Sequence, residues 1–249
     1  MFHAPYLSNA SQSLDNLLLA FGPIWREADA FLGNPSAKSD DVHQLKHEAI
    51  TLDQAFAKWQ ETQVEDFNPW IVGHVSQVQA GSKLGVGYWP GRVDTYFDLY
   101  VAAVWNISRT ARVLLINVIL KLSGILNDNQ DHTREHQDVL RLIEDIVSSI
   151  PFHLAEDLHV FLREMGHVAV GKADMEKKNA AAILNPGRPV GGLLLMHPIY
   201  VASKLSIVPQ QMREYMSECL EWIAEHMGIG QASLFAKVIF QHSQMLCIQ

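Results

Sequence analysis

The 249-residue chain is poor in cysteine and contains only Cys219 and Cys247. Two thiols cannot form a disulfide framework or a four-cysteine zinc site, which excludes the classes of small protein that depend on either. Both cysteines fall within apolar patterns of helical spacing. We therefore interpret them as buried free thiols of a protein that resides in a reducing compartment.

Basic residues are also few. The chain has 19 Lys and Arg against 27 Asp and Glu, a formal net charge of -8, and it contains no cluster of five or more basic residues. Nucleic-acid-binding domains normally carry a basic patch, because neutralisation of phosphates dominates their affinity. We expect that this chain does not bind DNA directly.

The sequence lacks any segment typical of secretion or of a membrane anchor. Residues 1–16, MFHAPYLSNASQSLDN, have neither the basic start nor the apolar core of a signal peptide. The longest strongly apolar run, residues 113–120, is flanked by Arg112 and Lys121 and is too short to cross a bilayer. These absences predict an intracellular protein, nuclear or cytoplasmic, with no membrane partner.

Helical periodicity, in contrast, is abundant. Hydrophobic residues make up 48% of the chain and charged residues 18%, a balance typical of a folded domain. Apolar residues recur at helical spacing over most of the length, and no long alternating strand pattern competes. We predict an all-α fold in a single helical domain over residues 1–249. Residues 62–93 are predicted to form a loop, because AGSKLGVGYWPGR contains four glycines and a proline.

The strongest pattern predicts a long central helix over residues 94–122. Asp94 and Thr95 suit its start, and Gly124 suits its end. Its apolar surface is wide, which indicates a helix that packs on more than one side.

Other boundaries follow from proline and glycine. Pro209 suits the first turn of a later helix, and Gly228 suits the end of that helix. Residues 154–183 resemble one or two shorter helices, whereas NPGRPVGG, residues 185–192, predicts a loop.

One short stretch, DHTREHQDVL at residues 131–140, contains two metal-binding patterns. His132, Glu135 and His136 match the H-x-x-E-H of inverzincin proteases, and His136 with Asp138 matches part of an iron-binding facial triad. Projected onto the helical apolar stripe, both histidines point inward. However, Asp131 suits an N-cap, an acid is favourable in a first helical turn, and no third ligand is evident. We predict a polar helix start without metal or cofactor.

A second partial motif is GHVAVGKA, residues 166–173. It matches the phosphate-binding loop except at Ala173, which has no hydroxyl for magnesium, and a helical pattern rather than a strand precedes it. Nucleophile-elbow, zinc-protease and C-x-x-C motifs are absent from the sequence. The motifs therefore favour a protein that is not an enzyme.

The polar residues of the central helix allow two interpretations. Arg109 and Arg112 lie three residues apart, and two like charges at this spacing need a compensating acid or ligand. They pair either with a carboxylate or helix-end carbonyls of the protein, or with a small molecule in a pocket that has aromatic walls. Under the second interpretation the ligand-binding residues are Tyr100, Trp105, Asn106, Arg109, Arg112, His197 and Tyr200.

Two long blocks carry a family resemblance. Residues 92–115, RVDTYFDLYVAAVWNISRTARVLL, and residues 191–238, GGLLLMHPIYVASKLSIVPQQMREYMSECLEWIAEHMGIGQASLFAKV, resemble the C-terminal helical region of fungal binuclear-zinc-cluster transcription factors. SIPFHL, residues 149–154, resembles a segment found between them. The resemblance implies an all-α regulatory domain that modulates transcription, commonly of pathway or secondary-metabolism genes.

The chain departs from that family in one respect. Family members bind DNA through an N-terminal six-cysteine module that holds two zinc ions, and this chain has no such cluster. We expect a transcription-factor-like regulatory protein of a fungal pathway, without its own DNA-binding module. It would act through protein partners of the transcription machinery or by sensing a small-molecule metabolite. Two alternatives remain: a repurposed biosynthetic enzyme with a pocket on the central helix, and an inactive remnant or interaction domain.

Overall fold

The computed structural model describes residues 13–33, 38–75, 89–128, 131–155, 157–158, 161–162, 166–168 and 188–237. The chain forms two compact units that are interleaved along the sequence. Unit 1 comprises Met1–Gln63 and Ser108–Leu142, and unit 2 comprises Val64–Ile107 and Ile143–Gln249. The single domain expected over residues 1–249 stays a prediction.

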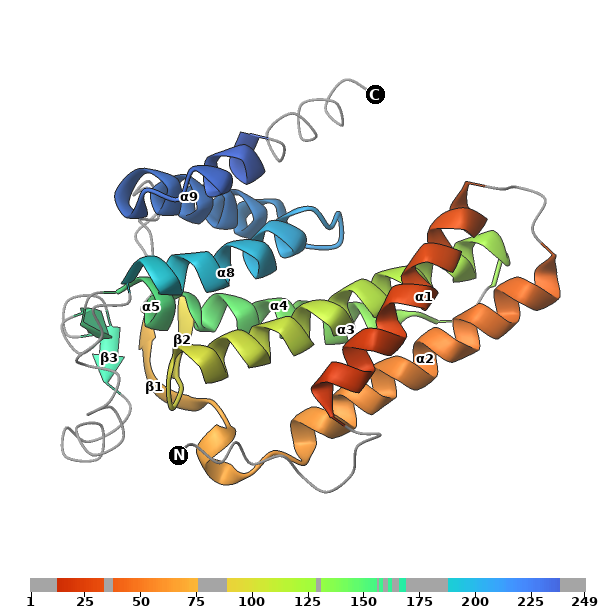
Figure 1. The fold of residues 1–249 in the computed structure, drawn as a ribbon, viewed down its shortest axis with the longest axis horizontal. Coiled ribbons are helices and arrows are strands. Elements are labelled where there is room, and N and C mark those ends of the chain that lie inside the picture. Colours follow the sequence, from red (N-terminus) through yellow and green to blue (C-terminus); the bar gives the residue numbers. More distant parts are fainter. Residues whose placement is uncertain are drawn as a thin grey trace. The chain divides into compact units, whose positions relative to one another are not determined.

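Unit 1 is helical in its described part. It contains α1 (Leu14–Leu32), α2 (Ser39–Glu61), most of α3 (Leu99–Ile125) and the first part of α4 (Thr133–Ser148). The hydroxyl of Ser13 accepts a hydrogen bond from the backbone N–H of Asn16 and so caps the start of α1. α1 and α2 pack along each other (Figure 1).

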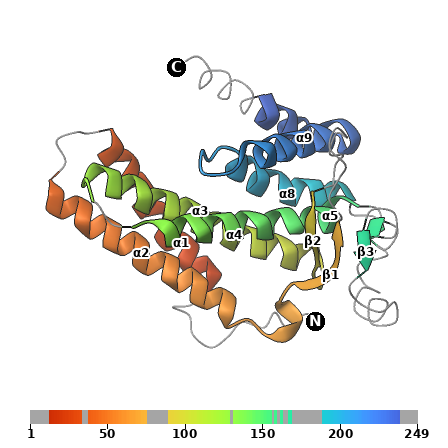
Figure 2. The same cartoon turned by 180° about the vertical axis from the view of Figure 1, so that it is seen from behind.

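Unit 2 holds the remaining elements. Its helices include the 3₁₀ turn η2 (Glu65–Phe67), α5 (Ile150–Leu154), α8 (Arg188–Ser203) and α9 (Gln210–Met227). α8 and α9 lie side by side in both views (Figure 1, Figure 2). α9 follows Pro209 and ends at Gly228, whose φ of 71° is left-handed, as predicted. The prediction of a mostly α-helical fold is confirmed.

A small antiparallel sheet in unit 2 was not predicted. Its strands are β1 (Trp70–Val75), β2 (Gly91–Thr95) and β3 (Gly166–Val168), in the order β2-β1-β3. The prediction of a loop over residues 62–93 and of helix over 154–183 was therefore wrong where these strands lie. β1 has an irregular register between Ile71 and Gly73, and β3 has only three residues, so neither strand produces a clear alternating pattern.

The central helix α3 starts later than predicted. Asp94 and Thr95 belong to β2, where they pair with Ile71 and Trp70 of β1. The side chain of Asp98 instead accepts the backbone N–H of Val101 at 2.7 Å and caps the helix. Asp94 and Asp98 are both suitable caps for a helix. Because Asp94 belongs to the strand that pairs with β1, α3 starts after Asp98.

α3 runs to Ile125 and is the most apolar of the long described helices. Its length and composition alone would allow it to cross a membrane, but 72% of its most apolar 18-residue window is buried within the protein. The core helix of a folded protein has the same composition. Burial against the rest of the chain therefore accounts for the apolar residues of α3.

Two glycines set how closely α8 packs. A Cβ atom on Gly191 would lie 2.2 Å from the carbonyl oxygen of His153 in α5, and one on Gly192 would lie 2.3 Å from the sulfur of Met227 in α9. The loop predicted over residues 185–192 is wrong from Arg188 onward, because these glycines serve close helix packing rather than a turn. Residues 169–173 of the partial phosphate loop, and Cys247, lie outside the described residues.

We predict that Gly191→Ala lowers the free energy of unfolding by about 1–3 kcal/mol, because the new methyl group meets a backbone carbonyl that cannot move independently. Thermal and denaturant unfolding of the purified chain would measure this. Gly230→Ala is the matched control in the same unit, since nothing lies within 4 Å of its added Cβ. Equal stability of the two variants would contradict the packing role of Gly191.

Candidate functional site

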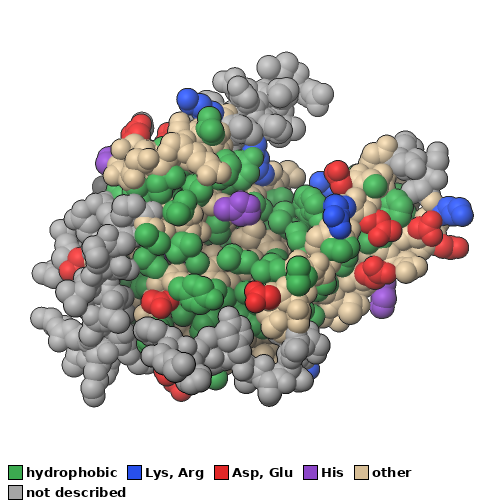
Figure 3. All heavy atoms as spheres, viewed as in Figure 1, with side chains coloured by type: hydrophobic (Ala, Val, Ile, Leu, Met, Phe, Trp, Pro, Cys, Tyr) green, Lys and Arg blue, Asp and Glu red, His purple; other side chains and the backbone are tan. Residues whose placement is uncertain are grey.

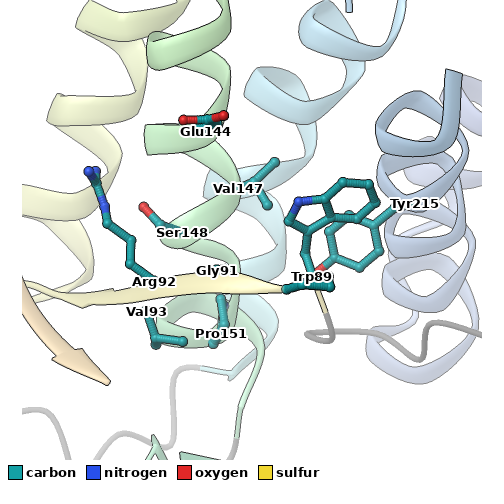
Figure 4. Close-up of a pocket in the computed structure, with 10 residues that line it drawn as sticks. Trp89, Gly91, Arg92, Val93, Glu144, Val147, Ser148, Pro151 and Tyr215 are labelled. Atoms are coloured by element: carbon teal, nitrogen blue, oxygen red, sulfur yellow. The ribbon is translucent and has the colours of Figure 1, made fainter. Parts of the chain in front are cut away.

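A pocket of about 290 Å³ lies within unit 2 (Figure 4). It is formed by the start of β2, the end of α4 with the first turn of α5, and α9. Its lining residues are Trp89, Pro90, Gly91, Arg92, Val93, Glu144, Val147, Ser148, Pro151 and Tyr215. Three segments that are far apart in the sequence thus meet around one cavity.

One wall of the pocket is aromatic. The rings of Trp89 and Tyr215 have centroids 5.3 Å apart with an interplanar angle of 38°. Tyr215 is 1% exposed and is fixed in the core of unit 2, whereas Trp89 is half-buried. Trp89 is therefore the member of the pair whose ring a planar ligand in the pocket could contact, and Tyr215 holds that ring in place.

Figure 4 shows Arg92 and Ser148 on the opposite side of the pocket from Trp89 and Tyr215, and both belong to an ion-pair network. The Nε and Nη2 atoms of Arg92 donate to the two carboxylate oxygens of Asp94 at 3.1 Å each, and Nη2 also donates to Asp145. The hydroxyl of Ser148 donates to Asp94 at 2.6 Å. Burial by itself lowers the pKa of Arg92, but the two carboxylates outweigh burial and raise the pKa.

The network determines the charge of the pocket. Asp94 and Asp145 both form ion pairs with Arg92, so the positive charge of its guanidinium is already neutralised within the protein. Glu144 lines the same pocket one helical turn before Ser148, and its side chain is exposed. Two carboxylates thus neutralise the guanidinium that lines the pocket, and Glu144 adds a negative charge to the lining.

Two of the sequence-predicted ligand residues serve internal bonding in unit 2. The indole N–H of Trp105 donates to the carbonyl oxygen of Phe67 at 2.7 Å. The amide nitrogen of Asn106, which is completely buried, donates to the hydroxyl of Ser149 at 2.9 Å and lies 3.3 Å from Nε2 of His153. These bonds tie α3 to η2 and to the start of α5.

The arginines of α3 lie in unit 1. Arg112 donates from Nε to a carboxylate oxygen of Asp53 and from Nη1 to the side-chain oxygen of Gln60, each at 2.9 Å. Arg109 is 2% exposed. For Arg112 the first interpretation, pairing with a carboxylate of the protein, is confirmed.

The other predicted residues are spread over unit 2. Tyr100 is 64% exposed, and His197 on α8 is exposed. The ring of Tyr200 stacks on that of Phe235 with centroids 4.2 Å apart, and Nζ of Lys204 lies 5.4 Å from the centroid of Tyr200. None of the seven residues lines the described pocket, and their ligand-binding role stays a prediction.

Sequence reasoning missed the pocket because its members gave no shared signal. The available clue was Trp89, a large aromatic residue beside Pro90 and Gly91 in a glycine-rich stretch. Such a residue has little to pack against in a loop unless another element covers it. Its partner Tyr215 lies on an ordinary helical face 126 positions later.

The histidine motif forms the start of α4. The carbonyl of His132 accepts the first helical hydrogen bond, from His136, so His132 rather than Asp131 holds the N-cap position. Asp131 lies one residue earlier, and its carboxylate accepts the backbone N–H of Thr133 at 2.9 Å, which satisfies the first N–H of the helix. Nδ1 of His136 lies 2.7 Å from the carbonyl oxygen of His132, and His136 is exposed, so the inward projection of His136 was wrong. Within the described ranges, no group of three or more His, Cys, Asp or Glu residues could hold a metal ion.

The described residues form helices and one small antiparallel sheet, so the molecule is a mostly α-helical protein. In these residues the charged groups around Arg92 pair with one another, and no catalytic centre is evident. The chain is 46% identical, over 239 residues, to transcription factor dbaG of Emericella nidulans. The alignment covers 95% of this chain and 54% of that protein, so the chain spans about half the length of its curated relative. No family model matches the chain, and no solved structure matches it.

We predict that Asp53→Ala lowers the free energy of unfolding by about 3 kcal/mol, because it leaves the buried guanidinium of Arg112 without its carboxylate. The double variant Asp53→Leu/Arg112→Met should regain most of that loss, since no charge stays buried. Asp138→Ala, which removes a partner of the exposed Arg141, is the control and should change stability by less than about 0.5 kcal/mol. Denaturant unfolding measures all three; unchanged stability of Asp53→Ala would favour a ligand-binding Arg112.

A pH titration tests the start of α4. The hydrogen bonds from the hydroxyl and the backbone N–H of Thr133 lower the pKa of Asp131 below its ordinary value. The stabilisation is therefore present above that ordinary value and is lost as the pH falls through the lowered pKa. NMR titration of the Asp131 carboxyl should show the lowered pKa in the native chain and a rise toward the ordinary value in Thr133→Ala. An ordinary pKa in the native chain would contradict the hydrogen bonds between Asp131 and Thr133.

Proposed function

We propose that this chain is a transcription-factor-like regulatory protein of a fungal pathway, and that the pathway belongs to secondary metabolism. The observation that carries the proposal is the 46% identity to a curated fungal transcription factor over nearly the whole chain. Identity of this extent over 239 residues indicates common descent and a shared fold. The proposal covers the regulatory part of that function, exerted in the nucleus or between cytoplasm and nucleus.

The properties of these 249 residues support regulation rather than contact with DNA. The net charge of -8 opposes binding to a phosphate backbone, and two cysteines cannot form a six-cysteine zinc cluster. On the face drawn in Figure 3, the described Lys and Arg side chains are scattered and do not gather into a continuous patch. We infer action through protein partners of the transcription machinery or through a bound small molecule.

A tethering experiment tests the proposal. The chain is fused to a heterologous DNA-binding domain in a fungal host whose reporter carries the matching operator. We expect reporter transcription to change several-fold relative to the DNA-binding domain alone, because recruitment to the promoter replaces the missing contact with DNA. A reporter without the operator is the control. Transcription equal to that of the unfused DNA-binding domain, with the fusion present at normal level, would overturn the regulatory role.

The DNA-binding expectation is tested separately with the purified 249-residue chain and duplex oligonucleotides in a mobility-shift assay. We expect no site-selective complex, and any weak association should disappear as the salt concentration rises, because it depends on counterion release. A sequence-selective complex that survives raised salt would contradict this expectation.

A further inference from the structure

We propose that the pocket of unit 2 binds a small planar aromatic amine, with its ring against Trp89 and its protonated amine paired with Glu144. The proposal goes beyond the proposed function, since it names a ligand class for a site that does not depend on the regulatory role. It is based on the shape of the cavity, the aromatic wall and the sign of the charge.

The aromatic wall selects a flat ring. The buried ring of Tyr215 supports that of Trp89 at a centroid separation of 5.3 Å and an inclination of 38°, and Pro90 and Pro151 also line the pocket. The ring of Trp89 favours a second ring in an offset or edge-to-face position. The π face of a tryptophan also attracts a nearby cation, so an aromatic amine gains an attraction that an aromatic carboxylate does not.

The charge of the pocket selects a cation or a hydrogen-bond donor. Arg92 is compensated by Asp94 and Asp145, so it offers little to an anionic ligand. Glu144, in contrast, has no hydrogen-bond or ion-pair partner among the residues that the structure describes. An ammonium group would pair with this carboxylate, whereas a carboxylate or phosphate would be repelled by it.

The volume selects a small ligand. At about 290 Å³ the cavity is at the lower limit of ligand pockets, which span roughly 300–1,000 Å³. A ligand with one ring or two fused rings and a short aminoalkyl chain is of this size. Larger polycyclic molecules would have to extend out of the cavity.

Three probes that share one aromatic ring and differ in charge distinguish the contribution of the ring to binding from the contribution of the charge. Tyramine carries an ammonium group, tyrosol a neutral hydroxyl and 4-hydroxyphenylacetate a carboxylate on the same 4-hydroxyphenyl ring. In titrations of the full chain followed by ligand-detected NMR, we expect tyramine to bind about fivefold to tenfold more tightly than 4-hydroxyphenylacetate, with tyrosol between them.

Substitutions at Glu144 test the ion pair. Glu144→Gln should remove the preference for tyramine, and Glu144→Lys should reverse it in favour of 4-hydroxyphenylacetate. A reversal cannot result from misfolding, which would abolish binding of every probe. Glu225→Gln is the matched control, because Glu225 is an exposed acid of the same unit that does not line the pocket.

A substitution at Trp89 tests the aromatic wall. Trp89→Leu should weaken all three probes by about tenfold without changing their order. Trp25→Leu, at a 37% exposed tryptophan of unit 1, is the control and should leave binding unchanged. Backbone amide spectra of each variant report whether the fold is intact.

Each outcome of these titrations either supports or overturns the proposed ligand site. Binding in the expected order, with loss at Glu144→Gln and reversal at Glu144→Lys, supports the site. Equal binding of the three probes, indifference to Glu144, or no binding at millimolar concentration overturns it. The reporter experiment is independent of these titrations, so failure of the ligand site and failure of the regulatory role are distinguishable.

Discussion

The arrangement of unit 2 depends on the carboxylate of Asp94, which is 1% exposed. A buried carboxylate is costly unless charged and hydrogen-bonding groups surround it. Arg92 and Ser148 provide these groups, and because Ser148 lies on α4, the bonds fix strand β2 to that helix. The second ion pair of Arg92, with Asp145 on the same helix, strengthens the connection. The pocket exists because this junction holds the residues before β2 beside the end of α4.

The sequence predicted the long elements well and the short ones poorly. α2, α3 and α9 each span several turns, so their periodic apolar positions outweigh local ambiguity, and the end of α9 follows from Gly228. The three strands are too short and too irregular to produce a pattern. The start of α3 was misplaced because Asp94 and Asp98 carry the same capping chemistry, and only the pairing of strands, which is non-local, distinguishes them.

The candidate site could be predicted only in part. The like charges of Arg109 and Arg112 indicated a compensating acid, and Asp53 supplies it for Arg112. The pocket was beyond sequence reasoning, because Trp89, Glu144 and Tyr215 come from three separated segments. Each of these residues is ordinary in its own segment. Their combination depends on how β2, α4 and α9 pack within unit 2, which no local pattern encodes.

The adjacent glycines of α8 have a consequence for the specificity of packing rather than for its strength. If α8 advanced by one residue, with the rotation about its axis that this requires, Val190 or Leu193 would take the place of a glycine against the carbonyl of His153 or the sulfur of Met227. Both flanking side chains are too large for that separation, and they are half-exposed in the observed position. Steric exclusion thus opposes a one-residue displacement of α8 against α5 and α9.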